Sequence, residues 1–178
     1  RLVSRPHFER LANLLRQAEQ RGQVLLGGRM DEKERRIEPT LLRVDDPDND
    51  PLMQEELFGP LLPVLRVPHL EAAIARVQAG PKPLALYLFG QCPQDRQRLR
   101  LATSSGSLAF NDVVMQVGVP QLPLGGVGES GMGAYHGHRG FLTFSHQRSI
   151  LEQRFWPDLP FRYPPYTGKL SLVKRLMG

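Results

Sequence analysis

The sequence predicts an α/β fold with a mostly parallel sheet and flanking helices, and three observations support this class. Apolar stretches short enough for strands alternate with stretches of helical periodicity. Residues 84–89, LALYLF, are a continuous apolar run, as expected for a strand buried on both faces. The order strand, helix, strand, helix, strand over residues 61–110 favours right-handed βαβ crossovers. A chain of 178 residues then corresponds to one domain or a large part of one.

The amino terminus is predicted to be a helix. Ser4 and Pro6 are typical of a helix start, because a capping hydroxyl is followed by proline in the first turn. Gly22 ends the helical pattern. Between these limits, apolar residues recur at helical spacing: Phe8, Leu11, Ala12, Leu15 and Ala18.

Two extended segments and an acidic turn come next. Residues 24–26 form a short apolar run, and residues 36–44 form a longer one in which Pro39 favours a sheet edge or a bulge. Residues 45–51, DDPDNDP, are a turn by composition. The turn lacks the glycine and the terminal glutamate of a calcium-binding loop, so we expect no metal there.

The middle of the chain alternates strands and helices. Strands are predicted at residues 61–67, 84–89 and 107–110, and helices at residues 69–79 and 93–102. The first of these helices has one apolar stripe that ends at a glycine. The second is charged and begins with a proline. This alternation is the basis of the predicted parallel sheet.

Composition and charge exclude several classes of protein. Hydrophobic residues at 40% and charged residues at 23% are typical of a globular chain, and no apolar run approaches the roughly 20 residues of a membrane span. The net charge of +5 is concentrated in residues 146–178, with six Lys or Arg against two acidic residues. No basic face with interleaved aromatics extends over the domain, so we expect no nucleic-acid partner. The basic tail is compatible with a membrane surface, an acidic partner or a solvated end.

A glycine-rich stretch, residues 111–138, contains six glycines within thirteen residues. Within it, residues 126–131 match the G-x-G-x-x-G pattern of a dinucleotide-binding loop. That loop should leave a strand and open a helix, whereas here Gln-Leu-Pro-Leu precedes it and a glycine-rich, extended stretch follows. The glycines therefore indicate positive φ angles or close backbone contacts rather than a pyrophosphate site.

Carboxylates and an aromatic side chain lie together in Glu55-Glu56-Leu57-Phe58-Gly59-Pro60. The residues allow two interpretations. One is a solvated helix end, which composition alone favours. The other is a site where a carboxylate accepts hydrogen bonds from the vicinal hydroxyls of a sugar while the aromatic flanks a planar ring.

Four motifs in order resemble the C-terminal part of an aldehyde dehydrogenase, closest to the class 3-type branch that includes fatty aldehyde dehydrogenases. They are MQEELFGPLLPV, FND, LPLGGVGESGMGAYHG and FLTFSHQRSIL, and the likeness runs from the first helix to Leu151. It implies NAD- or NADP-dependent oxidation of an aldehyde to a carboxylic acid. In that family a cysteine thiolate attacks the carbonyl, and a glutamate-activated water hydrolyses the thioester.

The resemblance also assigns residues to a site. Glu56 matches the family's ribose-binding glutamate and Phe58 its ring-packing phenylalanine. Asn111 matches an asparagine behind the substrate. Leu124 stands where the family's LPFGG motif has phenylalanine, so an aliphatic side chain replaces the aromatic one that would approach the nicotinamide and the substrate. Apolar residues of the loop 113–119 would line the tunnel for an apolar aldehyde: Val114, Met115, Val117 and Val119.

The family's catalytic cysteine and general-base glutamate precede the matching segment, so we expect no catalytic residue in this chain and predict that the chain alone is inactive. Cys92, the only cysteine, precedes a proline-started helix and has no evident base beside it. A single cysteine also favours a reducing, cytoplasmic compartment. His136, His138 and His146 lack a carboxylate or thiol at ligand spacing, so no metal site is expected.

Three regions are expected along the chain: a partial catalytic domain at residues 1–140, an oligomerisation strand at 141–151 and a basic, Pro- and aromatic-rich arm at 152–178. Alternation within FLTFSHQRSIL predicts the strand, and its resemblance to the family implies a homodimer through residues 141–150. The arm ends in a short helical pattern that could make a peripheral membrane contact. The alternative to an enzyme segment is a truncated, inactive remnant that acts only in self-association or subunit association.

Overall fold

The computed structural model describes residues 1–177, and its first element is helix α1 (Arg5–Gln20), where the sequence predicts it. The hydroxyl of Ser4 caps this helix by accepting a hydrogen bond from the His7 N–H at 3.3 Å. The apolar face is buried at Phe8, Leu11, Ala12, Leu15 and Ala18. Each of its large side chains contributes about 1.5–3 kcal/mol by leaving water, so this face anchors the core.

The buried face of α1 packs on a three-stranded sheet in the order β1-β4-β5. The central strand, β4 (Thr40–Val44), is antiparallel to β1 (Val24–Leu26) and parallel to β5 (Leu61–Leu65). Burial alternates along β4, and Leu42 and Val44 are almost fully enclosed. The sheet therefore turns one face to the helix, as period-two alternation requires.

The sequence predicted one extended segment at residues 36–44, but the structure has two strands there. β3 (Arg36–Ile37) pairs with β2 (Met30–Asp31) in a separate hairpin, and β4 begins three residues later. Pro39 lies between the two strands. It has no N–H to donate to a strand ladder, so the pairing is interrupted at this residue. The next N–H, that of Thr40, donates instead to the carbonyl of Pro60 at 2.8 Å.

The acidic turn at residues 45–51 is stabilised by hydrogen bonds between its own residues. The carboxylate of Asp46 accepts hydrogen bonds from the Asn49 side-chain amide at 2.8 Å and from the Asp48 N–H at 3.2 Å. The bond from Asn49 is the main cause that lowers the pKa of Asp46. Among the described residues, no group of three or more His, Cys, Asp or Glu is placed to hold a metal ion.

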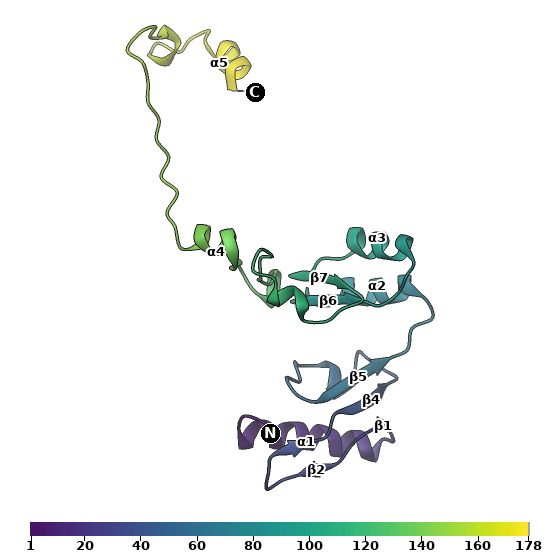
Figure 1. The fold of residues 1–178 in the computed structure, drawn as a ribbon. Helices are drawn as coiled ribbons and strands as arrows, with labels where there is room; N and C mark the ends of the chain where they lie inside the picture. The colour runs from purple at the N-terminus through teal and green to yellow at the C-terminus, as the bar shows by residue number, and fades with distance from the viewer. Residues whose placement is uncertain (178) are drawn as a thin grey trace.

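The second part of the chain contains α2 (Leu70–Ala79), β6 (Ala85–Leu88), α3 (Pro93–Ala102) and β7 (Ser107–Phe110) (Figure 1). β6 and β7 are parallel and joined through α3, as the predicted βαβ unit requires. The two helices touch where the side-chain amide of Gln78 donates to the Ala102 carbonyl at 2.7 Å.

The predicted single, mostly parallel sheet is not what the described residues form. They form three small sheets, in which two strand pairs are parallel and two antiparallel. The helix α2 joins β5 to β6, but these two strands belong to different sheets. All four residues of β6 are therefore only half-buried, although the apolar run predicted a strand covered on both faces. The coarser prediction of an α/β fold is confirmed by the mixture of helices and strands.

The glycine-rich stretch folds back on itself after β7. A Cβ on Gly125 would lie 2.1 Å from the Gly133 carbonyl oxygen, and one on Gly126 would lie 2.0 Å from the Ser130 carbonyl oxygen. Both distances are impossible for a real Cβ, so these positions require glycine. The expectation of close backbone contacts is thereby confirmed for this stretch.

The strand expected at residues 141–151 is wrong at its start. Phe141 to Thr143 belong to helix α4 (Gly137–Thr143), and the residues from 146 to 151 have no ladder partner. Alternation of apolar and polar residues describes a strand only when a neighbouring strand supplies hydrogen bonds, and none does so within residues 1–177. Whether 144–150 joins a sheet of another subunit stays a prediction.

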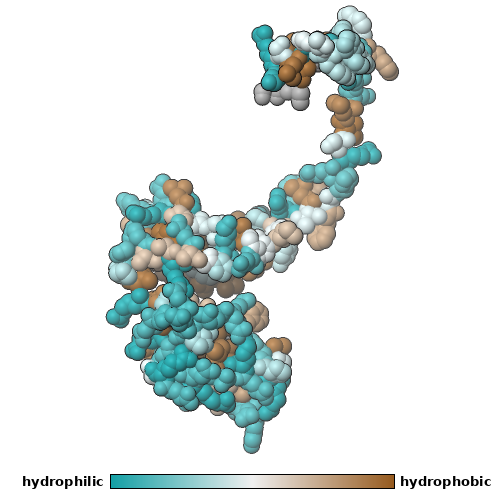
Figure 2. All heavy atoms as spheres, turned by 180° about the vertical axis from the view of Figure 1, so that it is seen from behind, coloured by the Kyte–Doolittle hydropathy of each residue, from teal (hydrophilic) through white to brown (hydrophobic). Residues whose placement is uncertain are grey.

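The carboxyl-terminal region runs away from the rest of the molecule (Figure 1) and contains the helix α5 (Leu170–Met177). Figure 2 shows apolar side chains on the narrow segment that leads to it. Ile150, Leu151, Phe155 and Trp156 are each at least 77% exposed. No helix among residues 1–177 is both long and apolar enough to cross a membrane. Gly178, the last residue of the expected arm, lies outside the described residues, as do the side chains of Leu176 and Met177.

Candidate functional site

Side chains of helix α1 bind the backbone of the loop that carries Glu56 and Phe58. The Nε2 atom of His7 is 2.9 Å from the Phe58 carbonyl oxygen. Arg10 donates from Nη2 to the Leu57 carbonyl at 2.8 Å and to the Glu56 carbonyl at 3.3 Å. Three successive carbonyl groups are therefore bound by two side chains one helical turn apart.

With these carbonyls fixed, the side chains of Glu56 and Phe58 face outward, whereas that of Leu57 between them is buried in the core. The ring of Phe58 is 76% exposed, its φ is +48°, and Glu56 is exposed beside it. The next residue, Gly59, lies against α1 so closely that a Cβ would be 2.4 Å from Cδ1 of Leu11. An exposed carboxylate and an exposed aromatic ring on a pinned loop are suited to a ligand that contains hydroxyls and a flat ring.

A second group of site residues follows β7 at its carboxyl end. Asn111 extends the β6–β7 pairing by donating its N–H to the Leu88 carbonyl at 2.9 Å. Its side-chain Oδ1 accepts from the Gly90 N–H at 2.7 Å, and its own φ is +58°. Asn111 therefore connects the segments that leave both strands.

The predicted tunnel residues lie on the loop after Asn111, and their side chains are accessible. Val114, Met115 and Val117 are 62%, 63% and 37% exposed. Leu124 is half-buried, and it forms an isolated antiparallel bridge with Tyr135. An exposed apolar wall next to the fixed Asn111 is chemically suited to an apolar chain.

The structure brings the predicted residues together in two groups rather than one. Glu56 and Phe58 are attached to the first sheet, whereas the tunnel residues follow the β6–β7 pair. No hydrogen bond joins the two groups in the part of the chain that the structure describes.

The sequence did not indicate the residues that hold the two loops. His7 and Arg10 hold the first loop, and Tyr87 and Gln116 hold the second, where the Tyr87 hydroxyl accepts hydrogen bonds from the Val114 N–H at 3.2 Å and from Nε2 of Gln116 at 3.0 Å. His7 and Arg10 lie on the polar side of an amphipathic helix, where such residues are ordinarily solvated. Tyr87 lies in a strand of otherwise apolar residues, and its hydroxyl is the one signal there, because the hydroxyl of a tyrosine within a strand usually needs a hydrogen-bond partner.

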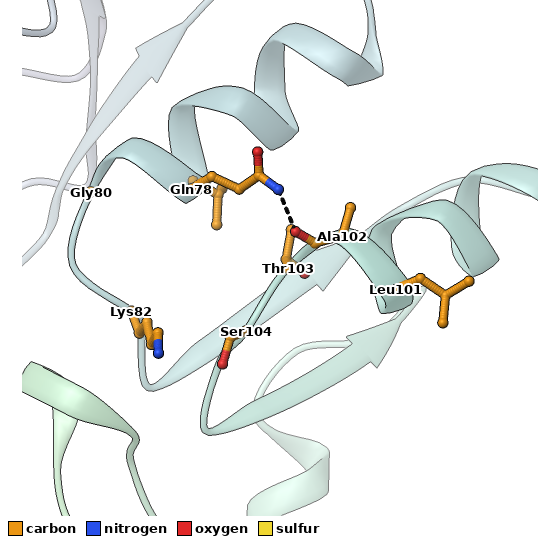
Figure 3. A pocket seen from close by; sticks show the side chains of 8 residues that line it. Gln78, Gly80, Lys82, Leu101, Ala102, Thr103 and Ser104 are labelled. Carbon is orange, nitrogen blue, oxygen red and sulfur yellow. Dashed lines mark hydrogen bonds between the residues drawn. The ribbon is translucent and has the colours of Figure 1, made fainter.

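A cavity of about 350 Å³ opens between α2 and α3. Figure 3 shows Gln78 reaching the Ala102 carbonyl there, while Lys82 and Ser104 lie on the connections that lead into the two strands. This cavity is at the amino ends of β6 and β7. Ligands of α/β sheets bind outside the carboxyl ends of the strands, where Asn111 lies. The cavity lies at the opposite ends, so it is not the expected place for a substrate or cofactor.

Cys92 is exposed at the N-cap position of α3. Its thiol donates a weak hydrogen bond to Oε1 of Gln94 at 3.3 Å. The glutamine amide cannot take up a proton, so this contact does not activate a nucleophile.

The histidines near the glycine stretch pack against aromatic rings. His136 meets Tyr135 edge to face with centroids 4.5 Å apart, and His138 stacks on Phe141 at 6.3 Å.

This combination of an α/β fold, a pinned carboxylate–aromatic loop and an apolar loop behind an asparagine agrees with comparisons to known proteins. The model of the aldehyde dehydrogenase family matches residues 2–150. The chain belongs to the aldehyde dehydrogenase family.

Relatives from the family 3 branch match almost the whole chain. Aldehyde dehydrogenase family 3 member H1 of Arabidopsis thaliana is 42% identical over 99% of this chain and 37% of its own length. Aldehyde dehydrogenase family 3 member B1 of Bos taurus is 46% identical over 95% of this chain and 36% of its own. The resemblance to the class 3-type branch is therefore confirmed. This chain spans a little more than a third of the length of these relatives.

Solved structures show the same fold. The substrate-bound state of the Staphylococcus aureus enzyme AldH superposes with a TM-score of 0.85 at 42% identity, covering 100% of this chain and 38% of that one. The aldehyde dehydrogenase of Mycobacterium tuberculosis complexed with NAD⁺ gives 0.74 at 25% identity, covering 85% of this chain and 32% of that one.

Proposed function

We propose that this chain is the carboxyl-terminal segment of an NAD- or NADP-dependent aldehyde dehydrogenase subunit that oxidises an aldehyde to a carboxylic acid. In this proposal residues 1–140 are part of the catalytic domain, residues 141–151 mediate oligomerisation and residues 152–178 form an arm. Membership of the family supports the proposal.

The observation that carries it is the loop held by His7 and Arg10. Because the carbonyls of residues 56–58 are bound from α1 and the Leu57 side chain is buried in the core, the side chains on either side of Leu57 face outward. The loop presents the Glu56 carboxylate and the Phe58 ring together to solvent. A solvated helix end, the other interpretation of these residues, would not need three carbonyls fixed from another element.

These residues fit a nicotinamide cofactor. The Glu56 carboxylate would accept hydrogen bonds from ribose hydroxyls, and Phe58 would pack against the flat ring. When bound, such a cofactor accepts the hydride of the aldehyde carbon. The NAD⁺ complex of the Mycobacterium tuberculosis relative supports a nicotinamide cofactor, and both NAD and NADP are compatible with the residues present.

The remaining site residues would form one wall of the aldehyde tunnel. Asn111 would fix the wall to both strands of the β6–β7 pair, and the apolar side chains that follow would contact an apolar aldehyde. These side chains are Val114, Met115, Val117 and Leu124. Leu124 takes less room than an aromatic side chain would, so it leaves space at the end of the wall.

The thiol and the general base are expected outside these 178 residues. Cys92 has no base beside it, and its neighbour Gln94 cannot act as one. The chain by itself would therefore bind cofactor weakly, at most, and would not turn over aldehyde.

The test is Glu56→Gln in the complete product of the gene that contains this chain. The exchange keeps the size of the side chain but weakens its bonds to ribose hydroxyls, so the KM for the cofactor should rise and hydride transfer should slow. Glu19→Gln, at an exposed glutamate of α1, is the matched control and should change neither. Unchanged cofactor KM and unchanged hydride transfer in Glu56→Gln would exclude the assignment.

A second candidate function is association without catalysis. The segment 144–151 exposes large apolar side chains, among them Phe144 at 89% and Leu151 at 94% exposure, and among the described residues its backbone has no ladder partner from residue 146 onward. Such a segment can add a strand to a sheet of another subunit, which would produce a homodimer. A remnant with this role would dimerise but show no aldehyde-dependent cofactor reduction in its complete form.

The arm could also touch a membrane surface. Helix α5 carries Lys174 and Arg175 in its last turn, with Leu170 and Leu172 exposed at 65% and 46%. A cytoplasmic protein with this arm would bind anionic vesicles peripherally. Flotation of the complete protein with such vesicles, compared with a protein lacking residues 152–178, measures this contact.

A further inference from the structure

The loop that would line the aldehyde tunnel contains a strained residue. Val114 has φ +66° and ψ −30°, a region that a β-branched residue rarely adopts. A backbone conformation of this kind persists only where the surrounding structure enforces it. The conformation of the loop must therefore be fixed by specific contacts rather than by its own preference.

One tyrosine supplies those contacts. The hydroxyl oxygen of Tyr87 accepts a hydrogen bond from the Val114 N–H at 3.2 Å and a second from Nε2 of Gln116 at 3.0 Å. The same Nε2 also donates to Oγ of Ser107 at 3.2 Å. The hydroxyl thus holds the strained residue directly and holds the next turn of the loop through the glutamine.

The two residues under this contact, Tyr87 and Ser107, both belong to the β6–β7 strand pair. In the parallel β6–β7 pair, Ser107 is opposite Ala85, and Tyr87 is two residues beyond Ala85. Residues two apart on a strand share a face, so Tyr87 and Ser107 are on the same side of the pair. The Gln116 amide spans both strands from the loop above them.

The position of Gln116 leaves one of its polar atoms without a hydrogen bond within residues 1–177. Its Oε1 atom is buried and has no hydrogen-bond partner among the described residues. An unsatisfied buried oxygen is unfavourable, so the amide remains because of the two bonds that its nitrogen makes. A residue that only filled space would not need to be polar.

We propose that Tyr87 and Gln116 are positioning residues that hold the strained loop 113–119 against the β6–β7 pair, and that this contact sets the selectivity between long and short apolar aldehydes. The proposal rests on the proposed function, because the loop is taken as one wall of the tunnel. Without the hydroxyl, Val114 would relax toward negative φ and the side chains of the wall would move. A long aldehyde touches this wall and a short one does not, so mainly the KM of long aldehydes would change.

The test uses Tyr87→Phe in the complete gene product, with octanal and propanal as substrates. We expect kcat/KM for octanal relative to propanal to fall about 3- to 10-fold, as expected for the loss of one or two net hydrogen bonds. The kcat for propanal and the KM for the cofactor should stay unchanged. Tyr163→Phe is the matched control, since its hydroxyl bonds Asp158 at 2.8 Å in the arm, and it should leave the ratio unchanged.

A second variant separates strain from general stability. Val114→Gly removes the penalty of a positive φ, so adding Tyr87→Phe to it should change the ratio by less than about twofold. If Tyr87→Phe does not fold, Gln116→Ala carries the test and should shift the ratio in the same direction. If a folded variant kept the parent's ratio of kcat/KM for octanal to that for propanal, the inference about Tyr87 and Gln116 would be overturned. Aldehyde oxidation by the parent protein would still support the proposed function in that case. A parent protein that reduces neither cofactor with either aldehyde would overturn both.

Discussion

Arg10 gives the sharpest prediction about the cofactor loop. Arg10→Met keeps the aliphatic length of the side chain but removes its bonds to the Glu56 and Leu57 carbonyls and to the Glu55 carboxylate. Hydrogen bonds from a charged donor contribute about 1.5–3 kcal/mol each when buried. Here the side chain is 30% exposed and the freed carbonyls can bind water, so a net loss of about 1–2 kcal/mol in the ordering of the loop is expected. The exposed pair with Glu55 adds little.

That loss should appear as weaker cofactor binding in the complete gene product. Since a factor of ten corresponds to about 1.4 kcal/mol, the KM for NAD or NADP should rise roughly 5- to 30-fold. The unfolding midpoint should change little, because the loop is at the surface of the core. Steady-state kinetics with saturating propanal measure the first quantity, and thermal unfolding measures the second.

The matched control is Arg16→Met on the same helix. Arg16 is exposed and makes no side-chain hydrogen bond within residues 1–177, so its loss should leave the cofactor KM unchanged. If Arg10→Met and Arg16→Met gave the same cofactor KM within about twofold, the loop would not depend on Arg10 and the reasoning would be refuted.

Two further predictions concern stability. Gly126→Ala places a Cβ 2.0 Å from a backbone oxygen and should lower the free energy of unfolding by about 1–3 kcal/mol or more, whereas Gly90→Ala has open space and should change it little; equal values in denaturant titrations would contradict the close packing. The hydrogen bond from Arg29 is the main cause that lowers the pKa of Glu38 below its ordinary value of 4.5. The ionised Glu38 carboxylate therefore stabilises the fold at pH values above its ordinary pKa of 4.5. This stabilisation is lost as the pH falls through the lowered pKa of the folded state. Glu38→Gln should be slightly less stable than the parent at pH 7 and equal to it at the acid end; a difference independent of pH would contradict this.

Local signals in the sequence were enough to place several elements. Ser4 and Pro6 locate the start of α1 because a cap and a first-turn proline act within a few residues. Pro93 locates the start of α3 in the same way. The α/β class followed from the alternation of these elements, which is also a property of neighbouring residues.

Features that depend on distant partners could not be predicted in this way. The segment 141–151 alternates like a strand, but the described residues offer it no neighbour and α4 takes its first three residues. His7 contacts a carbonyl 51 residues away, and Gln116 contacts a hydroxyl 29 residues away. Nothing in the spacing of these residues indicates such pairs. Their effect is to shape the loops on which the proposed site depends.

Aldehyde-dependent formation of NADH or NADPH tests the central claim most directly, measured for the 178-residue chain and for the complete gene product. We predict no turnover by the chain alone, turnover by the complete product, and no effect of Cys92→Ala on that turnover. Turnover by the chain alone that Cys92→Ala abolished would contradict the claim that the catalytic thiol lies elsewhere. A complete product that reduced neither cofactor would contradict the proposed activity itself.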